Sequence, residues 1–182
     1  CLGCDKFSSQ SEKYPKIQDN NDRIFSEETA YQMTSILEGA VKRGTAKKLR
    51  DLKVPVAGKT GTTNNNYDAW FIGFTSNLVI GVYVGFDNPR TLGKYETGSK
   101  AALPIFKDFI QNSLYKEDFK EFKIPNGIFL TSLNYDTGVK STIGNKNTII
   151  EALKGKDINN INNNKLISIG SYDKLIKYRQ FY

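Results

Sequence analysis

Two short apolar runs, separated by three polar residues, limit the folds open to this chain more than any other feature. They read DAWFIGF over residues 68–74 and LVIGVYVGF over residues 78–86, with Thr75-Ser76-Asn77 between them. Both runs are rich in aromatic and β-branched residues, so they predict the two strands of an antiparallel hairpin. The second run is apolar on both of its alternating faces, which predicts a central strand buried on both sides.

Amphipathic helices are predicted before and after this hairpin. Ser26 can cap a helix whose apolar residues recur at helical spacing to about residue 42. Apolar residues recur in the same way over residues 102–114, where Pro104 falls in the tolerant first turn. Residues 53–63 predict a further strand, whose proline fits a sheet edge or the first residues of a strand better than a central position. This order predicts the α+β class, with an antiparallel sheet covered by helices.

The aromatic side chains of the hairpin are predicted to lie in the core. Trp70, Phe71 and Phe74 all belong to the first of the two strands, and aromatic residues on such strands usually pack inside. Asp68 is expected to begin this strand and to hydrogen-bond the preceding turn, which the three asparagines at residues 64–66 indicate.

The chain divides into three segments by its sequence. Residues 1–115 hold the predicted sheet and helices, and residues 116–144 predict a short β extension that turns at Asp136-Thr137-Gly138. Residues 145–182 are rich in asparagine and predict a flexible tail.

Composition argues against several classes of function. The net charge is +7, but the lysines are scattered, which is not typical of a nucleic-acid-binding surface. No apolar run of about 18 residues and no basic segment followed by an apolar run occurs, so neither a membrane span nor a signal peptide is predicted. Cys1 and Cys4 are the only cysteines and histidine is absent, so no metal or cofactor is expected. The two cysteines form either a short disulfide, outside the cytoplasm, or two free thiols.

The element Gly58-Lys59-Thr60-Gly61-Thr62 could belong to two kinds of site. A phosphate-binding loop requires another glycine five residues earlier, where Lys53 stands, and a helix directly after the Lys-Thr pair. Asparagines and a strand follow instead, so this interpretation fails twice. The second kind of site is a strand with a lysine, a hydroxyl residue and a glycine beside a cleft that holds a nucleophilic serine.

The residue types of this element suit serine acyl transfer. On a strand, Lys59 and Gly61 share one face while Thr60 and Thr62 share the other. An amine near a serine hydroxyl can relay its proton, and its charge favours an anionic substrate. Threonine hydroxyls can donate to a carboxylate, and Gly61 lets an acyl group approach the backbone.

Longer blocks around this element resemble the C-terminal half of the transpeptidase domain of class A penicillin-binding proteins. The resemblance covers residues 1 to about 142. Its blocks, in the family's order and with similar spacing, are RIFSEETAYQMTSILEGAVKRGTAKKL, VPVAGKTGTTNNNYDAWFIGFTSNLVIGVYVGFDNPRTLG, GSKAALPIFKDFI and the weaker FKIPNGIFLTSLNYDTG. The opening CLGC is similar to a Cys-x-Gly-Cys in the alphaproteobacterial branch of the family.

The resemblance implies a partial β-lactamase/transpeptidase-like fold, with residues 1–115 as the C-terminal part of the transpeptidase domain. It also implies a bifunctional peptidoglycan synthase on the periplasmic side of the bacterial inner membrane, with a glycosyltransferase domain before the transpeptidase. A serine attacks the D-Ala-D-Ala end of a stem peptide, forms an acyl-enzyme and passes the acyl group to an amine, and β-lactams trap the same serine. Lys59 and Thr62 would be catalytic, the latter through its backbone N–H in the oxyanion hole. Thr60, Gly61, Thr62 and Thr63 would bind the substrate.

The family's Ser-x-x-Lys nucleophile and Ser-x-Asn element precede its Lys-Thr-Gly by more residues than this chain has before Lys59. Matches to these patterns at Ser113, Ser132 and Ser171 all follow Lys59 and are expected by chance. This chain is therefore expected to be a fragment that is inactive alone and needs the upstream half of the domain. A non-catalytic binding module on the same sheet is the alternative. A serine β-lactamase also carries Lys-Thr-Gly, but the Asp-Ala-Trp-Phe block and the cysteine pair argue against it.

Overall fold

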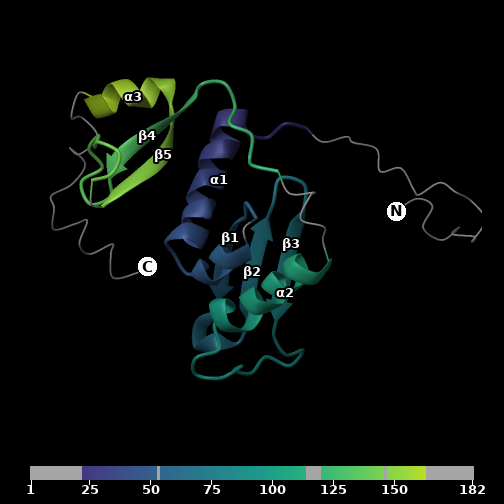
Figure 1. Ribbon diagram of the computed structural model, residues 1–182. Coiled ribbons are helices and arrows are strands. Elements are labelled where there is room, and N and C mark those ends of the chain that lie inside the picture. The colour runs from purple at the N-terminus through teal and green to yellow at the C-terminus, as the bar shows by residue number, and fades with distance from the viewer. Residues whose placement is uncertain (1–21, 53, 114–119, 146, 163–182) are drawn as a thin grey trace, which may run out of the picture.

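A computed structural model of the chain describes residues 22–52, 54–113, 120–145 and 147–162 (Figure 1). Cys1 and Cys4, the predicted cysteine pair, lie outside these residues, as do Ser171 and the last twenty residues of the predicted tail, 163–182. Among the helices described, none is long and apolar enough to cross a membrane.

Three antiparallel strands form the main sheet. They are β1 (Ala57–Thr62), β2 (Ala69–Phe74) and β3 (Val79–Val84), in the order β1-β2-β3. The hairpin predicted from the two apolar runs is confirmed as β2 and β3. The strand predicted within residues 53–63 is confirmed as β1, which lies at one edge of the sheet. A short 3₁₀ turn, η3 (Asn64–Asn66), joins β1 to β2, as the asparagines predict.

The prediction that the second apolar run is the central strand is wrong for the described part of the chain. β2 is central, whereas β3 pairs with β2 alone and has no fully buried residue. Val79 is 71% exposed on β3 and Tyr83 is 49% exposed. The apolar pattern shows which faces favour burial. Packing against the core half-buries Ile80, Val82 and Val84, but among the described residues no segment covers the other face of β3 or pairs with its outer edge.

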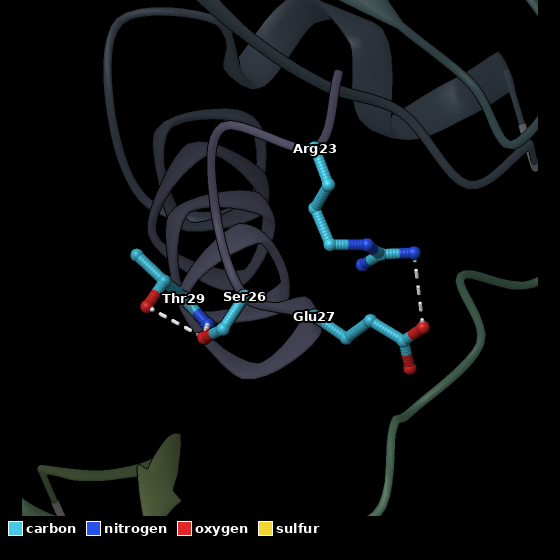
Figure 2. A network of polar contacts seen from close by, with 4 residues as sticks. All are labelled: Arg23, Ser26, Glu27 and Thr29. Atoms are coloured by element: carbon cyan, nitrogen blue, oxygen red, sulfur yellow. Dashed lines mark hydrogen bonds and ion pairs between the residues drawn. The ribbon is translucent and has the colours of Figure 1, made fainter. Parts of the chain in front are cut away.

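Helix α1 (Glu27–Lys42) starts where Ser26 caps it, as predicted. The Ser26 Oγ atom accepts from the Thr29 backbone N–H at 3.3 Å, and Arg23 forms an ion pair with Glu27 at 3.3 Å (Figure 2). The acidic first turn and the basic Lys42 at the other end suit the helix dipole. The capped helix runs alongside β1.

Two further helical segments pack on one face of the sheet. They are the 3₁₀ helix η2 (Lys47–Leu52) and helix α2 (Leu103–Ser113), which continues from a π-helical turn, η4 (Gly98–Ala102). Figure 1 shows α2 lying across β2 and β3. Pro104 occupies the first turn of α2, as predicted, where its missing N–H leaves no gap in the helix hydrogen bonds.

The core lies between α2, η2 and one face of β2. Phe71 and Phe106 are both fully buried there, with ring centroids 4.7 Å apart in an edge-to-face arrangement. The prediction for Phe71 is confirmed, and Phe74 is half-buried against Phe122. The prediction for Trp70 is wrong: it is 40% exposed on the opposite face, because neighbouring residues of a strand point to opposite sides.

A second, two-stranded sheet lies beside α1 and is separate from the main sheet. It consists of β4 (Ile128–Asn134) and β5 (Thr148–Lys154), with helix α3 (Gly155–Asn162) after it. Figure 1 shows this unit beside the upper part of α1, where Gln32 donates to the Ala152 carbonyl and Lys154 to the Thr29 hydroxyl.

The tail predicted from residue 145 onwards therefore contains regular structure. β5 pairs with β4 along seven residues, a partner that a count of asparagines could not reveal. The predicted turn at Asp136-Thr137-Gly138 does form. After it, Lys140 pairs back with Leu133 of β4 in an isolated antiparallel bridge. The main partner of β4, however, is β5.

Candidate functional site

The candidate site is the outer edge of β1. Thr63 donates its backbone N–H to the Asp68 carbonyl at 3.1 Å, which makes this pair a hydrogen-bonded one in the ladder with β2. Hydrogen-bonded and non-hydrogen-bonded pairs alternate along an antiparallel ladder. The Thr62–Ala69 and Thr60–Phe71 pairs are therefore of the second type. The backbone N–H and C=O groups of Thr60 and Thr62 consequently point away from β2, to the free edge.

Lys59 is exposed, as is Thr62 at the other end of the element. Lys59 lies opposite Ile72 on the open face of the sheet, and its Nζ atom donates to the Thr60 carbonyl oxygen at 3.1 Å. This contact agrees with a Thr60 carbonyl at the free edge. The ammonium therefore stands beside the same edge to which the two threonine backbones point.

Thr60 and Thr62 share the other face, as the strand alternation predicts. The Thr60 Oγ1 atom lies 2.8 Å from Thr45 Oγ1, where the chain leaves α1. The Thr62 Oγ1 atom accepts from the Gly98 backbone N–H at 3.0 Å, at the start of η4. The structure thus ties one threonine to the segment after α1 and the other to η4. No local signal in the sequence indicates either partner.

Gly61 has no room for a side chain beside Trp70. A Cβ atom on Gly61 would lie 3.2 Å from the Trp70 Cβ atom on the neighbouring strand, which is tighter than ordinary contact. The glycine therefore leaves the backbone bare on the face that Lys59 also occupies.

A hydrogen-bonded network supports the end of β1. Asp68 donates its N–H to Thr63 Oγ1 at 2.8 Å, as expected from sequence, and accepts from the same hydroxyl at its Oδ2 atom, at 3.3 Å. Tyr83 donates its hydroxyl to Asp68 Oδ1 at 2.9 Å, and its ring lies 4.7 Å from the Trp70 ring. The hydrogen bond to Asp68 raises the pKa of Tyr83 above its ordinary value. Thr63 is therefore held by protein groups, and sequence reasoning missed Tyr83.

Asn66 fixes the loop that leads to η4. Its side-chain amide donates to the carbonyls of Gly93 and Lys94, at 2.8 and 2.9 Å, and its own carbonyl accepts from Leu92 at 2.8 Å. Asn66 has a φ of 54°, in the left-handed region that asparagine tolerates better than most residues. The asparagine turn thus joins the end of β1 to the segment that carries Gly98.

Two other features lie away from this edge. A concave pocket of about 560 Å³ is lined by residues of η2 and α2 and by none of β1. Ser132, which matched a catalytic pattern by chance, lies on β4 in the second sheet. Among the described residues, no three His, Cys, Asp or Glu side chains gather closely enough to hold a metal ion.

Comparison with known families then assigns the chain to a family. The family description "Penicillin binding protein transpeptidase domain" matches residues 6–111, which include α1, the main sheet and most of α2. The chain belongs to this transpeptidase family. The sequence resemblance is confirmed, and so is the mixed fold with an antiparallel sheet and helices.

Individual relatives agree with the family assignment. Penicillin-binding protein 1A of Rickettsia felis is 37% identical over 98% of this chain and 22% of that protein. The protein of the same name from Pseudomonas aeruginosa is 39% identical over 75% of this chain and 17% of its own length. The crystal structure of penicillin-binding protein 1A from Haemophilus influenzae superposes with a TM-score of 0.62 at 31% identity, over 71% of this chain and 21% of that one. The chain thus spans about a fifth of the length of these relatives.

Proposed function

We propose that the protein containing this chain is a serine DD-transpeptidase that cross-links peptidoglycan stem peptides, and that this chain supplies one wall of its active site. The observation that carries the proposal is the free edge of β1. An ammonium, two threonine backbones and an exposed Thr62 side chain meet there, in a member of the transpeptidase family.

The edge of β1 suits an extended peptide with an anionic end. Such a peptide can add alongside β1, because the N–H and C=O groups of Thr60 and Thr62 point outwards. The Thr62 N–H would stabilise the oxyanion that forms when the serine attacks, an interaction that lowers a barrier by about 3 to 4 kcal/mol. The hydroxyls of Thr60 and Thr62 would bind the terminal carboxylate, and Gly61 would let the acyl group approach. Thr63 would support this subsite from the end of the strand.

Lys59 would act through its charge and its proton-relay capacity. In the proposed reaction the serine oxygen bonds to the penultimate D-Ala carbonyl carbon, and the terminal D-Ala leaves with a proton. A second stem peptide's amine then displaces the serine. The Lys59 ammonium favours the anionic substrate and lies close enough to the Thr60 carbonyl to be oriented by it.

The nucleophilic serine belongs, in this proposal, to an upstream half of the domain outside this chain. That half is the proposed partner for the open face and free edge of β3, where Val79 and Tyr83 are exposed. The parent protein would also carry a glycosyltransferase domain and act on the periplasmic side of the inner membrane, attached through its N-terminal part. β-Lactams would be its inhibitors, and no nucleic acid is a proposed partner.

A fluorescent penicillin tests the proposal on two lengths of protein. The full-length protein should become covalently labelled, and this chain alone should not. In the full-length protein, Lys59→Met should lower the labelling rate at least about a hundredfold, comparable to the loss of one group that stabilises the transition state. Lys48→Met, at another exposed lysine on η2, serves as the matched control and should label like the wild type.

Three results would contradict the proposal. They are a full-length protein that no penicillin labels, labelling of this chain by itself, and a Lys59→Met variant that labels at the wild-type rate. The first would favour the non-catalytic binding module on the same sheet.

A further inference from the structure

Gly98 makes an unusually close approach to β1. Its N–H reaches Thr62 Oγ1 at 3.0 Å, although the two residues are 36 positions apart. A Cβ atom at this position would overlap the Trp70 carbonyl oxygen and lie 2.5 Å from the Gly61 carbonyl oxygen. Both oxygens belong to the backbone of a ladder pair and cannot move aside as a flexible side chain could. Only glycine can therefore bring its N–H to this point.

The segment that carries Gly98 is held firmly. Gly98 begins η4, and π-helical turns of this kind occur often at functional sites. Ala102 at the end of η4 and Leu103 at the start of α2 are both fully buried in the core. The position of the Gly98 N–H is therefore set by the packing of α2 against the sheet.

This contact decides what the Thr62 hydroxyl can do. A hydroxyl has one hydrogen to donate and can accept at its oxygen. In Thr62 the oxygen already accepts from Gly98, and within the described residues the group makes no other hydrogen bond. Its hydrogen is thus left for a ligand at the exposed edge. Thr60 differs, because its hydroxyl has the Thr45 hydroxyl as a partner that can take its hydrogen.

We propose that Gly98 is a positioning residue for the transpeptidase reaction: its N–H holds the Thr62 hydroxyl as a donor aimed at the substrate's terminal carboxylate. This inference rests on the proposed function. A hydrogen bond from a pre-oriented hydroxyl to a carboxylate is charge-assisted, and it is stronger than one between neutral groups. Gly98 thus acts through Thr62 and contacts no substrate itself.

The test compares two substrates in the full-length protein. One is a penicillin with its free carboxylate, and the other is the methyl ester of the same penicillin. Gly98→Ala should lower the acylation rate of the acid by about ten- to a hundredfold, the value of one hydrogen bond to a charged group. It should leave the slow rate of the ester nearly unchanged, so the preference for the acid falls. Gly39→Ala, on α1 and away from the open face, is the matched control, because a Cβ atom there meets only the end of the flexible Arg43 side chain.

A second pair of variants covers the case in which Gly98→Ala does not fold. Thr62→Ser keeps the hydroxyl and should keep both the preference for the acid and the slow hydrogen exchange of the Gly98 amide. Thr62→Val removes the acceptor, so the preference should fall and the Gly98 amide should exchange faster.

The outcomes separate this inference from the proposed function. If the wild-type protein is acylated but the variants lower the acid and ester rates equally, Gly98 is only structural and the inference is wrong. An unchanged Gly98 exchange rate in Thr62→Val would also overturn it. If the wild-type protein reacts with neither penicillin, the proposed function itself fails and the inference fails with it.

Discussion

The two faces of the main sheet differ although the same strands build both. On the covered face, Phe71 packs against Phe106 and neither ring is exposed. On the open face, the adjacent residue of β2, Trp70, packs at a tilt against the Tyr83 ring while 40% of it stays exposed. Ile72, also on the open face, is 52% exposed.

The difference leaves an exposed apolar surface on one side of the sheet. An isolated sheet face in water favours polar residues, and a large exposed apolar patch usually marks an interface. The open face carries aromatic and aliphatic side chains, as a covered face would. Since the chain spans about a fifth of its relatives' length, we propose that another part of a longer protein covers this face.

Removing a ring from the covered face should have the largest effect on stability. Phe106→Ala should lower the free energy of unfolding by about 3 to 5 kcal/mol, because it leaves a cavity against Phe71. Trp70→Ala, on the open face, should cost only about 1 to 2 kcal/mol, since much of its ring is already in water. Urea denaturation monitored by circular dichroism measures both. Equal losses would show that the two faces are not energetically distinct.

The open face should govern self-association of the isolated chain. Ile72→Lys should reduce the sedimentation-measured aggregate severalfold, because a charge interrupts the apolar patch, and should change the free energy of unfolding by only about 0.5 kcal/mol. Ile105→Lys is a matched control on α2, since Ile105 is also 52% exposed but lies away from the open face. An equal reduction by both changes would assign the aggregation to net charge alone.

The smallest effect concerns an ion pair beside the covered face. Lys107 on α2 lies 2.6 Å from Asp51 on η2 and lowers the pKa of Asp51 below its ordinary value. A lowered folded-state pKa gives stability that is present above the unfolded pKa of about 3.9 and is lost as the pH falls through the lower folded value.

Asp51→Asn should therefore slightly reduce stability at neutral pH and flatten its decline as the pH falls below about 4. Thermal unfolding of both proteins over this range measures the difference. Parallel pH profiles would mean that the pair contributes nothing to folding.

The sequence predicted the local elements well because their signals are local. The cap at Ser26, the asparagine turn and the alternation that separates Lys59 from Thr60 all depend on residues a few positions apart. The predictions for β3, Trp70 and the segment from residue 145 failed where burial or pairing depends on distant chain. No local signal marked Gly98 or Tyr83 as partners of the β1 end, because their contacts arise only when η4 and β3 pack beside it.

The roles of Lys59, Thr60, Gly61, Thr62 and Thr63 remain proposals, although the geometry now gives them a physical basis. The phase of the ladder places the Thr60 and Thr62 backbones at the free edge, a fact that strand periodicity alone could not supply. Periodicity assigns side chains to faces, but only the pairing partner decides which backbone groups are left over.

The sequence alone determined the family, through long blocks that resemble it. It also determined the α+β class and the strand that carries Lys-Thr-Gly, through periods of two or 3.6 residues. The tertiary structure decided which face of the sheet is covered, that β5 completes β4, and that Gly98 meets Thr62. These features depend on contacts between residues far apart in the chain, whose geometry is fixed only when side chains pack without gaps.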